Sequence, residues 1–170
     1  YVILVPTLRC DLSCSYCQVS RAALNANGFD WTPDTLAQVL GFLDQEGGET
    51  IQVEFQGGEP TLRMDLILEV VRFCRIRFRA CRFVICSNLS QIGPELTALL
   101  KSEDVHLSTS LDGPPAVHTR QRTVQPDLTD QFHANLEKAT ALAATRVAAL
   151  PTLDPEHLPD PSALLDAFAA

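Results

Sequence analysis

Three cysteines near the start of the chain are the residues best suited to chemistry. Cys10, Cys14 and Cys17 lie within eight positions, directly after the apolar run at residues 2–5. Three thiolates can hold three corners of a cubane iron–sulfur cluster and leave the fourth iron without a protein ligand. A substrate or cosubstrate could bind that open iron, as it binds the open position of a catalytic zinc. Because a site that only carries electrons normally has four thiolate ligands, the pattern indicates chemistry at the iron.

The same cysteines have two simpler interpretations, a zinc site or three buried thiols. Zinc takes four ligands, and no further Cys-x-x-Cys or His pair nearby supplies the fourth, since the four histidines are scattered along the chain. The chain has six cysteines, but the first three are too closely spaced for the disulfide framework of a secreted protein. We therefore expect a metal cluster and a cytoplasmic location. The other thiols are expected to be buried like small apolar residues, with the last at a strand end: Cys74, Cys81 and Cys86.

The composition sets limits on size and partners. With 170 residues, of which 46% are hydrophobic, the chain can form one domain with a core. It has no run of about 18 apolar residues and no basic leader, so neither a membrane span nor a membrane partner is expected. The net charge of −8 argues against nucleic acid as a partner. One arginine cluster could bind an acidic partner, but we favour the solvated end of a helix for Arg72, Arg75, Arg77, Arg79 and Arg82.

Strand and helix patterns alternate five times along the chain. Apolar runs and alternation predict strands at residues 2–7, 51–55, 81–86, 105–111 and 147–153. Helices are predicted after each strand, the first capped by Thr32 and the last starting at Pro161, with a polar loop after Pro115. This alternation calls for a parallel sheet with helical crossovers, and so for an α/β fold. We expect residues 1–170 to form one domain of a longer protein, because the last predicted helix is unfinished.

Polar or glycine-rich groups follow four of the predicted strands. They are the three cysteines, residues 57–59, Ser87 with Asn88, and residues 110–112. The carboxyl ends of parallel strands share one edge of a sheet, where α/β folds build their sites whether the sheet is open or closed. We therefore expect these four groups to converge on one site.

Several of these residues fit either a structural or a binding role. Gly57 and Gly58 could form a turn, or could bring the backbone close to a ligand whose cationic group pairs with Glu59. Tyr16 could be a core residue, or could stack on an adenine ring.

Residues further along the chain have the same two interpretations. Asn88, Ser110 and Asp112 are of the types that cap turns, although we favour ligand contact for Ser110. Arg122 could bind a carboxylate through two hydrogen bonds or lie on the surface. Asp112 is a candidate general acid or base by position alone, and the sequence identifies no other catalytic residue.

The cysteine pattern together with the glycine motif resembles the radical S-adenosylmethionine (SAM) superfamily. The resemblance rests on Cys10-x3-Cys14-x2-Cys17, with Tyr16 before the last cysteine, and on the Gly-Gly-Glu-Pro motif at residues 57–60.

Further motifs resemble one branch of that superfamily. The run Ser-Leu-Asp-Gly-Pro at residues 110–114, with His118 and Arg122 behind it, is similar to anaerobic sulfatase maturases and other peptide-modifying SPASM enzymes. Residues 5–10 and 17–21 look most like the radical maturase of the His-Xaa-Ser system.

The resemblance implies a partial (β/α)6 TIM-like barrel, truncated here to about five β/α units, with a [4Fe-4S] cluster on the three cysteines and SAM on the open iron. Gly58 and Glu59 would receive the SAM amino group, and Ser110 with Asn88 would contact its carboxylate or ribose. Reduction would cleave SAM to methionine and a 5′-deoxyadenosyl radical that abstracts hydrogen from a substrate carbon. The implied partners are a peptide or protein substrate and an electron donor such as a flavodoxin or ferredoxin.

Two departures from the family pattern leave other functions open. Residues 87–89 read Ser-Asn-Leu where the family often has Thr-Asn-Gly. The sixth strand, and the auxiliary-cluster region of SPASM enzymes, would lie beyond residue 170. The alternatives are a radical SAM enzyme that acts on a small molecule, and a non-catalytic iron–sulfur sensor or scaffold.

Overall fold

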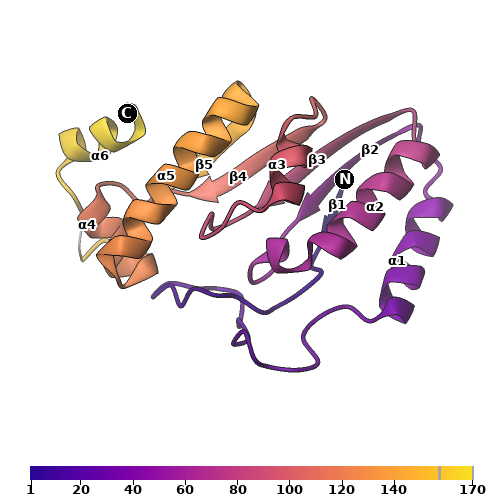
Figure 1. The fold of residues 1–170 in the computed structure, drawn as a ribbon, viewed down its shortest axis with the longest axis horizontal. Coiled ribbons are helices and arrows are strands. Elements are labelled where there is room, and N and C mark those ends of the chain that lie inside the picture. The colour runs from indigo at the N-terminus through magenta and orange to yellow at the C-terminus, as the bar shows by residue number, and fades with distance from the viewer. Residues whose placement is uncertain (157, 170) are drawn as a thin grey trace.

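The sheet is parallel throughout, as the alternation of strands and helices predicts. The computed structural model describes residues 1–156 and 158–169, and its five strands lie in the order β1-β2-β3-β4-β5 (Figure 1). Their bounds are β1 Val2–Leu4, β2 Thr50–Phe55, β3 Ala80–Cys86, β4 Val105–Ser110 and β5 Val147–Leu150. Because each neighbouring pair is parallel, all the carboxyl ends lie at one edge of the sheet.

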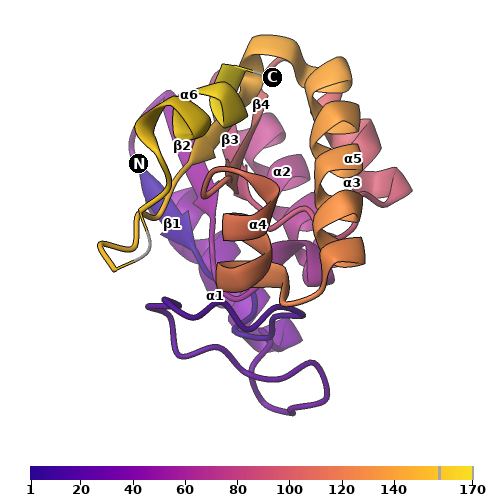
Figure 2. The ribbon, with the colours of Figure 1, turned by 90° about the vertical axis from the view of Figure 1, so that its left-hand side faces the viewer.

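Helices connect the strands and cover one face of the sheet, as Figures 1 and 2 show. α2 contacts β3, α3 contacts β4, α5 contacts β5, and α1 packs on α2. The helical segments are α1 Pro33–Gln45, η1 Pro60–Arg63, α2 Met64–Arg77, α3 Pro94–Leu100, α4 Pro115–His118, η2 Thr119–Thr123, α5 Pro126–Ala143, η3 Ala144–Arg146 and α6 Pro161–Ala169. Successive strands side by side with helices outside are the arrangement of a β/α barrel.

The first helix starts where the sequence predicts it. Oγ1 of Thr32 accepts a hydrogen bond from the backbone N–H of Thr35 at 3.1 Å, and Pro33 is the first helical residue. The cap satisfies one of the N–H groups that the first turn leaves without a helical partner.

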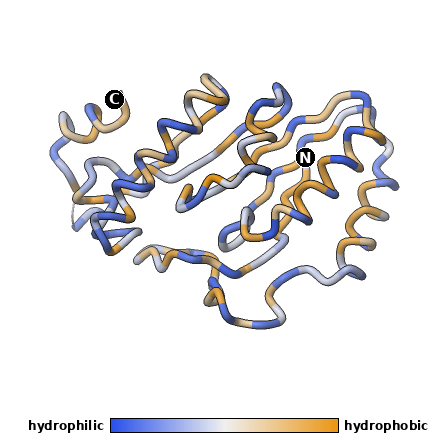
Figure 3. The backbone as a smooth tube through the Cα atoms, in the orientation of Figure 1, coloured by the Kyte–Doolittle hydropathy of each residue, from blue (hydrophilic) through white to orange (hydrophobic). Residues whose placement is uncertain are grey.

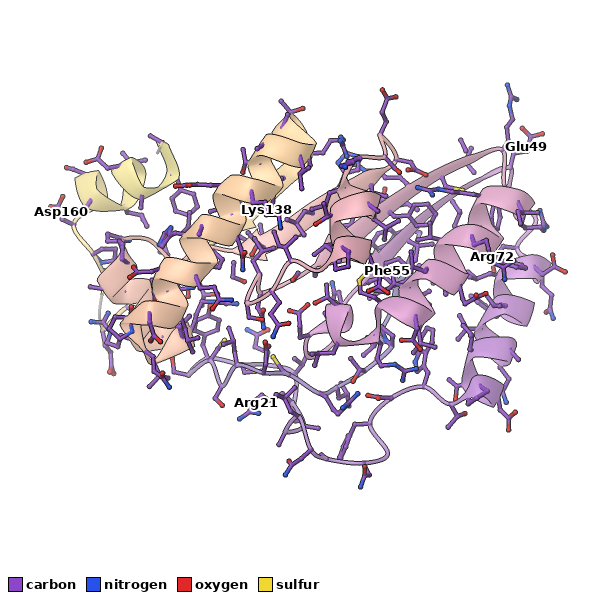
Figure 4. The ribbon with its side chains drawn as sticks, viewed as in Figure 1. Arg21, Glu49, Phe55, Arg72, Lys138 and Asp160 are labelled. Carbon is purple, nitrogen blue, oxygen red and sulfur yellow. The ribbon has the colours of Figure 1, made fainter. Side chains whose placement is uncertain are left out.

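The two faces of the sheet differ in polarity. Under the helices, alternate residues of β2, β3 and β4 are buried, and Phe55 and Phe83 are completely inaccessible. Figure 3 shows the resulting mixture of apolar and hydrophilic positions along the chain, and Figure 4 labels the buried Phe55 and the exposed Arg72. Each such aromatic burial contributes about 2–3 kcal/mol. The other face is partly open and carries polar side chains such as Glu54 and Ser108.

Two strands end three residues earlier than predicted, whereas β4 ends one residue early, at Ser110. β1 ends at Leu4 rather than at residue 7, and β5 ends at Leu150 rather than at residue 153. Pro6 and Pro151 lie just beyond these ends, and proline has no N–H with which to continue a ladder.

The prediction of a polar loop after Pro115 was wrong, because this segment is helical. It forms the short helix α4 and then the π-helical turn η2, which ends at Val124 in a left-handed conformation (φ 67°). Pro115 is the first helical residue, a position that proline favours, so the sequence did carry a signal for this helix. Single π-helical turns occur frequently at functional sites, and this turn carries Arg122.

Most of the arginine cluster lies where the sequence favoured it, in the C-terminal half of α2 and the turn that follows, but Arg82 lies in β3. Four of these arginines form ion pairs with acidic residues of the same chain, namely Arg72 with Glu69, Arg75 with Asp104, Arg77 with Asp44 and Arg79 with Glu49. Exposed pairs of this kind contribute about 0–1 kcal/mol each. In the part of the chain that the structure describes, none of the helices combines the length and apolar character needed to cross a bilayer.

Candidate functional site

A cavity of about 360 Å³ opens at the carboxyl edge of the sheet. Its wall combines the three cysteines with residues from the ends of β2, β3, β4 and β5. The predicted site residues that line it are Cys10, Cys14, Cys17, Tyr16, Gly57, Gly58, Asn88, Ser110 and Arg122. The predicted convergence of four strand ends on one site is therefore present in the structure. Glu59 and Asp112, also predicted, are buried and do not line the cavity.

The cysteine loop is held in place by backbone hydrogen bonds and by one ion pair. The N–H of Cys10 donates to the carbonyl of Ala22 at 3.0 Å, and the N–H of Ser15 donates to the carbonyl of Gln121 at 2.9 Å. The Arg9 guanidinium binds both carboxylate oxygens of Asp30, from Nε at 2.8 Å and from Nη2 at 2.5 Å. Arg9 and Asp30 were not predicted as site residues, because no local pattern links two positions that are 21 residues apart.

All six cysteines are free thiols. Cys10 and Cys14 are partly buried and Cys17 is exposed. Burial raises the pKa of the Cys10 thiol to about 11, and burial also raises the pKa of Cys14. Among the described residues, no three His, Cys, Asp or Glu side chains are grouped so that they could hold a single metal ion. A cluster differs in this respect, because each thiolate binds a different iron.

The glycine pair at the end of β2 packs directly against the cysteine loop. A Cβ atom on Gly57 would lie 2.2 Å from the carbonyl oxygen of Thr7, and one on Gly58 would lie 2.2 Å from that of Arg9. Gly57 also has φ 142°, a conformation that L side chains rarely adopt. Two backbone hydrogen bonds cross the same junction, from Gly58 N–H to Thr7 at 3.1 Å and from Glu59 N–H to Arg9 at 2.8 Å. The close approach therefore involves the protein's own backbone, and the glycines also line the cavity.

Glu59 is buried inside the protein, with 1% of its surface exposed. Its carboxylate accepts hydrogen bonds from the backbone N–H of Asn88 at 2.7 Å, from the backbone N–H of Thr61 at 3.1 Å and from the Thr61 hydroxyl. Burial raises the pKa of Glu59, and these donors oppose that shift. The geometry differs from the predicted pairing with a ligand cation, because protein donors already occupy the carboxylate.

A second network connects the cysteine loop to β4 and the π-helical turn. The Tyr16 hydroxyl donates to Oδ2 of Asp112 at 2.6 Å and accepts from Nη1 of Arg122 at 2.5 Å. The other oxygen of Asp112 accepts from the Thr152 N–H at 3.1 Å, and the carboxylate is completely buried. Burial raises the pKa of Tyr16 to about 12, although the Arg122 charge opposes the shift. Asp112 thus joins the end of β4 to the cysteine loop and to the segment after β5. These contacts favour a structural role for Asp112 over a role as general acid or base.

Arg122 is buried rather than exposed, so the surface interpretation was wrong. Only 5% of the residue is accessible, and its guanidinium lies 5.9 Å from the centre of the Tyr16 ring. Its Nε is buried with no hydrogen-bond partner among the described residues. A buried cation with an unused donor at the wall of a cavity can bind an anionic group.

The three remaining cysteines are less uniform than expected. Cys74 is completely buried, but Cys81 and Cys86 are only partly buried. Cys86 lines the cavity from the end of β3, and its thiol donates to Oε1 of Glu54 at 3.5 Å. Burial, followed by the Glu54 charge, raises the pKa of Cys86 to about 12, so the thiol is protonated at neutral pH.

The fold and the site define an α/β barrel domain with a three-cysteine loop at the carboxyl edge of its sheet. Comparison with known proteins adds that the chain belongs to the Radical SAM superfamily, whose sequence profile matches residues 4–160.

Related sequences belong to longer proteins. An uncharacterised protein of Methanocaldococcus jannaschii is 30% identical over 115 residues, which are 66% of this chain and 38% of the relative. The PqqA peptide cyclase of Bradyrhizobium diazoefficiens is 42% identical over 66 residues, which are 39% of this chain and 17% of that enzyme. The chain thus spans well under half the length of these relatives.

Solved structures of anSMEcpe, an anaerobic sulfatase maturase, have the same fold. The structure with bound AdoMet superimposes with a TM-score of 0.82 at 17% identity and covers 99% of this chain and 48% of the other. The structure with bound AdoMet and the Cp18Cys peptide gives the same score and identity. At this identity the likeness establishes the fold, which is the predicted truncated TIM-like barrel.

Proposed function

We propose that this chain is the core of a radical SAM enzyme that modifies a peptide or protein. The observation that carries the proposal is that three free thiols, a glycine pair and a buried arginine line one cavity. The relatives support a peptide substrate, since two of them are PqqA peptide cyclases and anSMEcpe was solved with peptides bound.

Cys10, Cys14 and Cys17 would hold the [4Fe-4S] cluster that the family implies. The donor set fits, because these thiols are free, lie on one loop and face one cavity with room for a ligand beside them. When bound, the cluster and SAM together supply a 5′-deoxyadenosyl radical that abstracts hydrogen from a substrate carbon. The residues around the cavity would orient these groups and exclude water.

Arg122 would bind the carboxylate of SAM, which would complete the hydrogen bonding of its buried Nε. Ser110, at the end of β4, would contact the carboxylate or the ribose. The backbone of Gly57 and Gly58 would receive the amino group, in place of the engaged Glu59 side chain. Tyr16 also lines the cavity, and its ring would lie against the adenine.

We further propose that residues 1–170 are one domain of a longer chain that works in the cytoplasm. The partial coverage of the relatives and the six free thiols support this setting. An electron donor such as a flavodoxin or ferredoxin would reduce the cluster.

The test uses the full-length protein, reconstituted anaerobically with iron and sulfide, reduced with dithionite and supplied with SAM. The matched variants are Cys14→Ala, which removes a ligand, and Cys81→Ala, which removes a thiol of β3 outside the cavity. We expect the wild type and Cys81→Ala to form 5′-deoxyadenosine and Cys14→Ala to form none.

The same preparation separates the alternatives. A loaded wild-type protein that neither binds nor cleaves SAM would overturn the proposal in favour of an iron–sulfur sensor or scaffold. If small molecules stimulate the cleavage of SAM and peptides do not, the protein is instead an enzyme that acts on a small molecule.

A further inference from the structure

The side-chain amide of Asn88 joins the end of β3 to the cysteine loop. Its Nδ2 donates to Oδ1 of Asp11 at 2.7 Å and approaches the sulfur of Cys10 at 3.7 Å. The amide nitrogen carries two hydrogens, so both contacts can form at the same time. The amide oxygen accepts from the backbone N–H of Ser90 at 2.8 Å. Both hydrogens of the amide are therefore used inside the protein, although the residue was predicted to contact SAM.

Buried groups fix this amide in position. The Glu59 carboxylate accepts the backbone N–H of Asn88, and the following residue, Leu89, is completely buried in a left-handed conformation with φ 55°. The hydroxyl of Ser90 donates to the second oxygen of Asp11. The amide cannot rotate away from the Cys10 sulfur without breaking several of these contacts, so its orientation is set by the fold.

We propose that Asn88 is a positioning residue that raises the reduction potential of the cluster held by Cys10, and that Asp11 lowers it. The inference rests on the proposed function, because it requires Cys10 to be a cluster ligand. A hydrogen bond to a ligating sulfur withdraws negative charge and so stabilises the reduced cluster. A carboxylate beside the same sulfur opposes the added electron. The amide lies between the two groups and donates to both.

The test compares variants whose effects have opposite signs. In the full-length, anaerobically reconstituted protein without SAM, redox titration followed by electron paramagnetic resonance gives the potential of the cluster. Asn88→Ala removes the donor and should lower the equilibrium constant for reduction roughly tenfold, or about 59 mV for one electron. Asp11→Asn removes the negative charge and should raise the potential. Cys81→Ala, which removes a thiol of β3 outside the cavity, should leave it unchanged.

A merely structural role would not give opposite shifts, because loosening the loop in either variant would reduce iron content or move both potentials the same way. An Asn88→Ala protein with full iron content and a wild-type or higher potential would overturn the inference. If Asn88→Ala binds no iron, Asp11→Asn decides: a raised potential supports the inference, and an unchanged or lowered one overturns it. A wild-type protein that takes up no cluster would overturn the proposed function instead.

Discussion

Gly58→Ala should damage both the stability of the protein and its loading with iron. A Cβ atom at this position would lie 2.2 Å from the carbonyl oxygen of Arg9 and 2.5 Å from that of Leu8. Both atoms belong to the backbone just before Cys10, so no flexible side chain can move aside. The cysteine loop would have to shift by about 1 Å to restore a van der Waals distance.

The cost can be estimated from the contacts that the shift would break. Two backbone hydrogen bonds cross the junction, and each contributes about 0.5–1.5 kcal/mol, with the buried strain adding a similar amount. The expected loss is about 2–4 kcal/mol, or roughly 4–16 °C in melting temperature for a domain of this size. Thermal unfolding followed by circular dichroism measures the first effect, and iron content after anaerobic reconstitution measures the second.

Gly41→Ala is the matched control. Gly41 lies in α1, and a Cβ atom at this position would have nothing within 4 Å of it, so this alanine should be neutral or stabilise the helix by up to about 1 kcal/mol. A Gly58→Ala protein whose free energy of unfolding lies within about 1 kcal/mol of the wild-type value, and whose iron content equals that of the wild type, would refute the role assigned to Gly58.

Three further changes test other parts of the structure. Burial lowers the pKa of His118 to about 3, below the value of about 6.5 in the unfolded chain. At pH 5 the unfolded chain therefore binds a proton that the folded protein does not, and the free energy of unfolding should fall by about 2 kcal/mol from pH 8 to pH 5. His118→Phe should remove most of this fall, as measured by urea unfolding curves. Tyr16→Phe leaves the buried Asp112 carboxylate without its hydroxyl donor and should cost about 1–3 kcal/mol by the same assay; no loss would contradict the network. Arg75→Ala breaks an exposed pair with Asp104 and should cost less than about 1 kcal/mol, and a larger loss would show that the pair is not mainly solvated.

The parts of the site that could be predicted from the sequence are those encoded locally. The cysteine spacing, the glycine motif at residues 57–58 and the strand alternation each lie within a few positions, and together they predict that these groups share one edge of a parallel sheet. Thr32 and Pro33 likewise predict the start of α1, because capping is a contact between near neighbours.

The parts that could not be predicted depend on partners far apart in sequence. Glu59 binds the backbone of Asn88, and Tyr16 binds Asp112, at separations that no periodicity reveals. The burial of Arg122 was missed for a related reason, since it follows from a π-helical turn inside a segment that was predicted to be a loop.

The anchoring of the cysteine loop has a consequence for where a substitution can disturb the site. Hydrogen bonds to the turn after β2, to the turn after β3 and to the π-helical turn hold the loop in place. Contacts within the protein thus fix the backbone of the loop, in which Cys17 is exposed and Cys10 and Cys14 are partly buried. A substitution in any of these three segments can therefore displace the cysteines without changing a thiol.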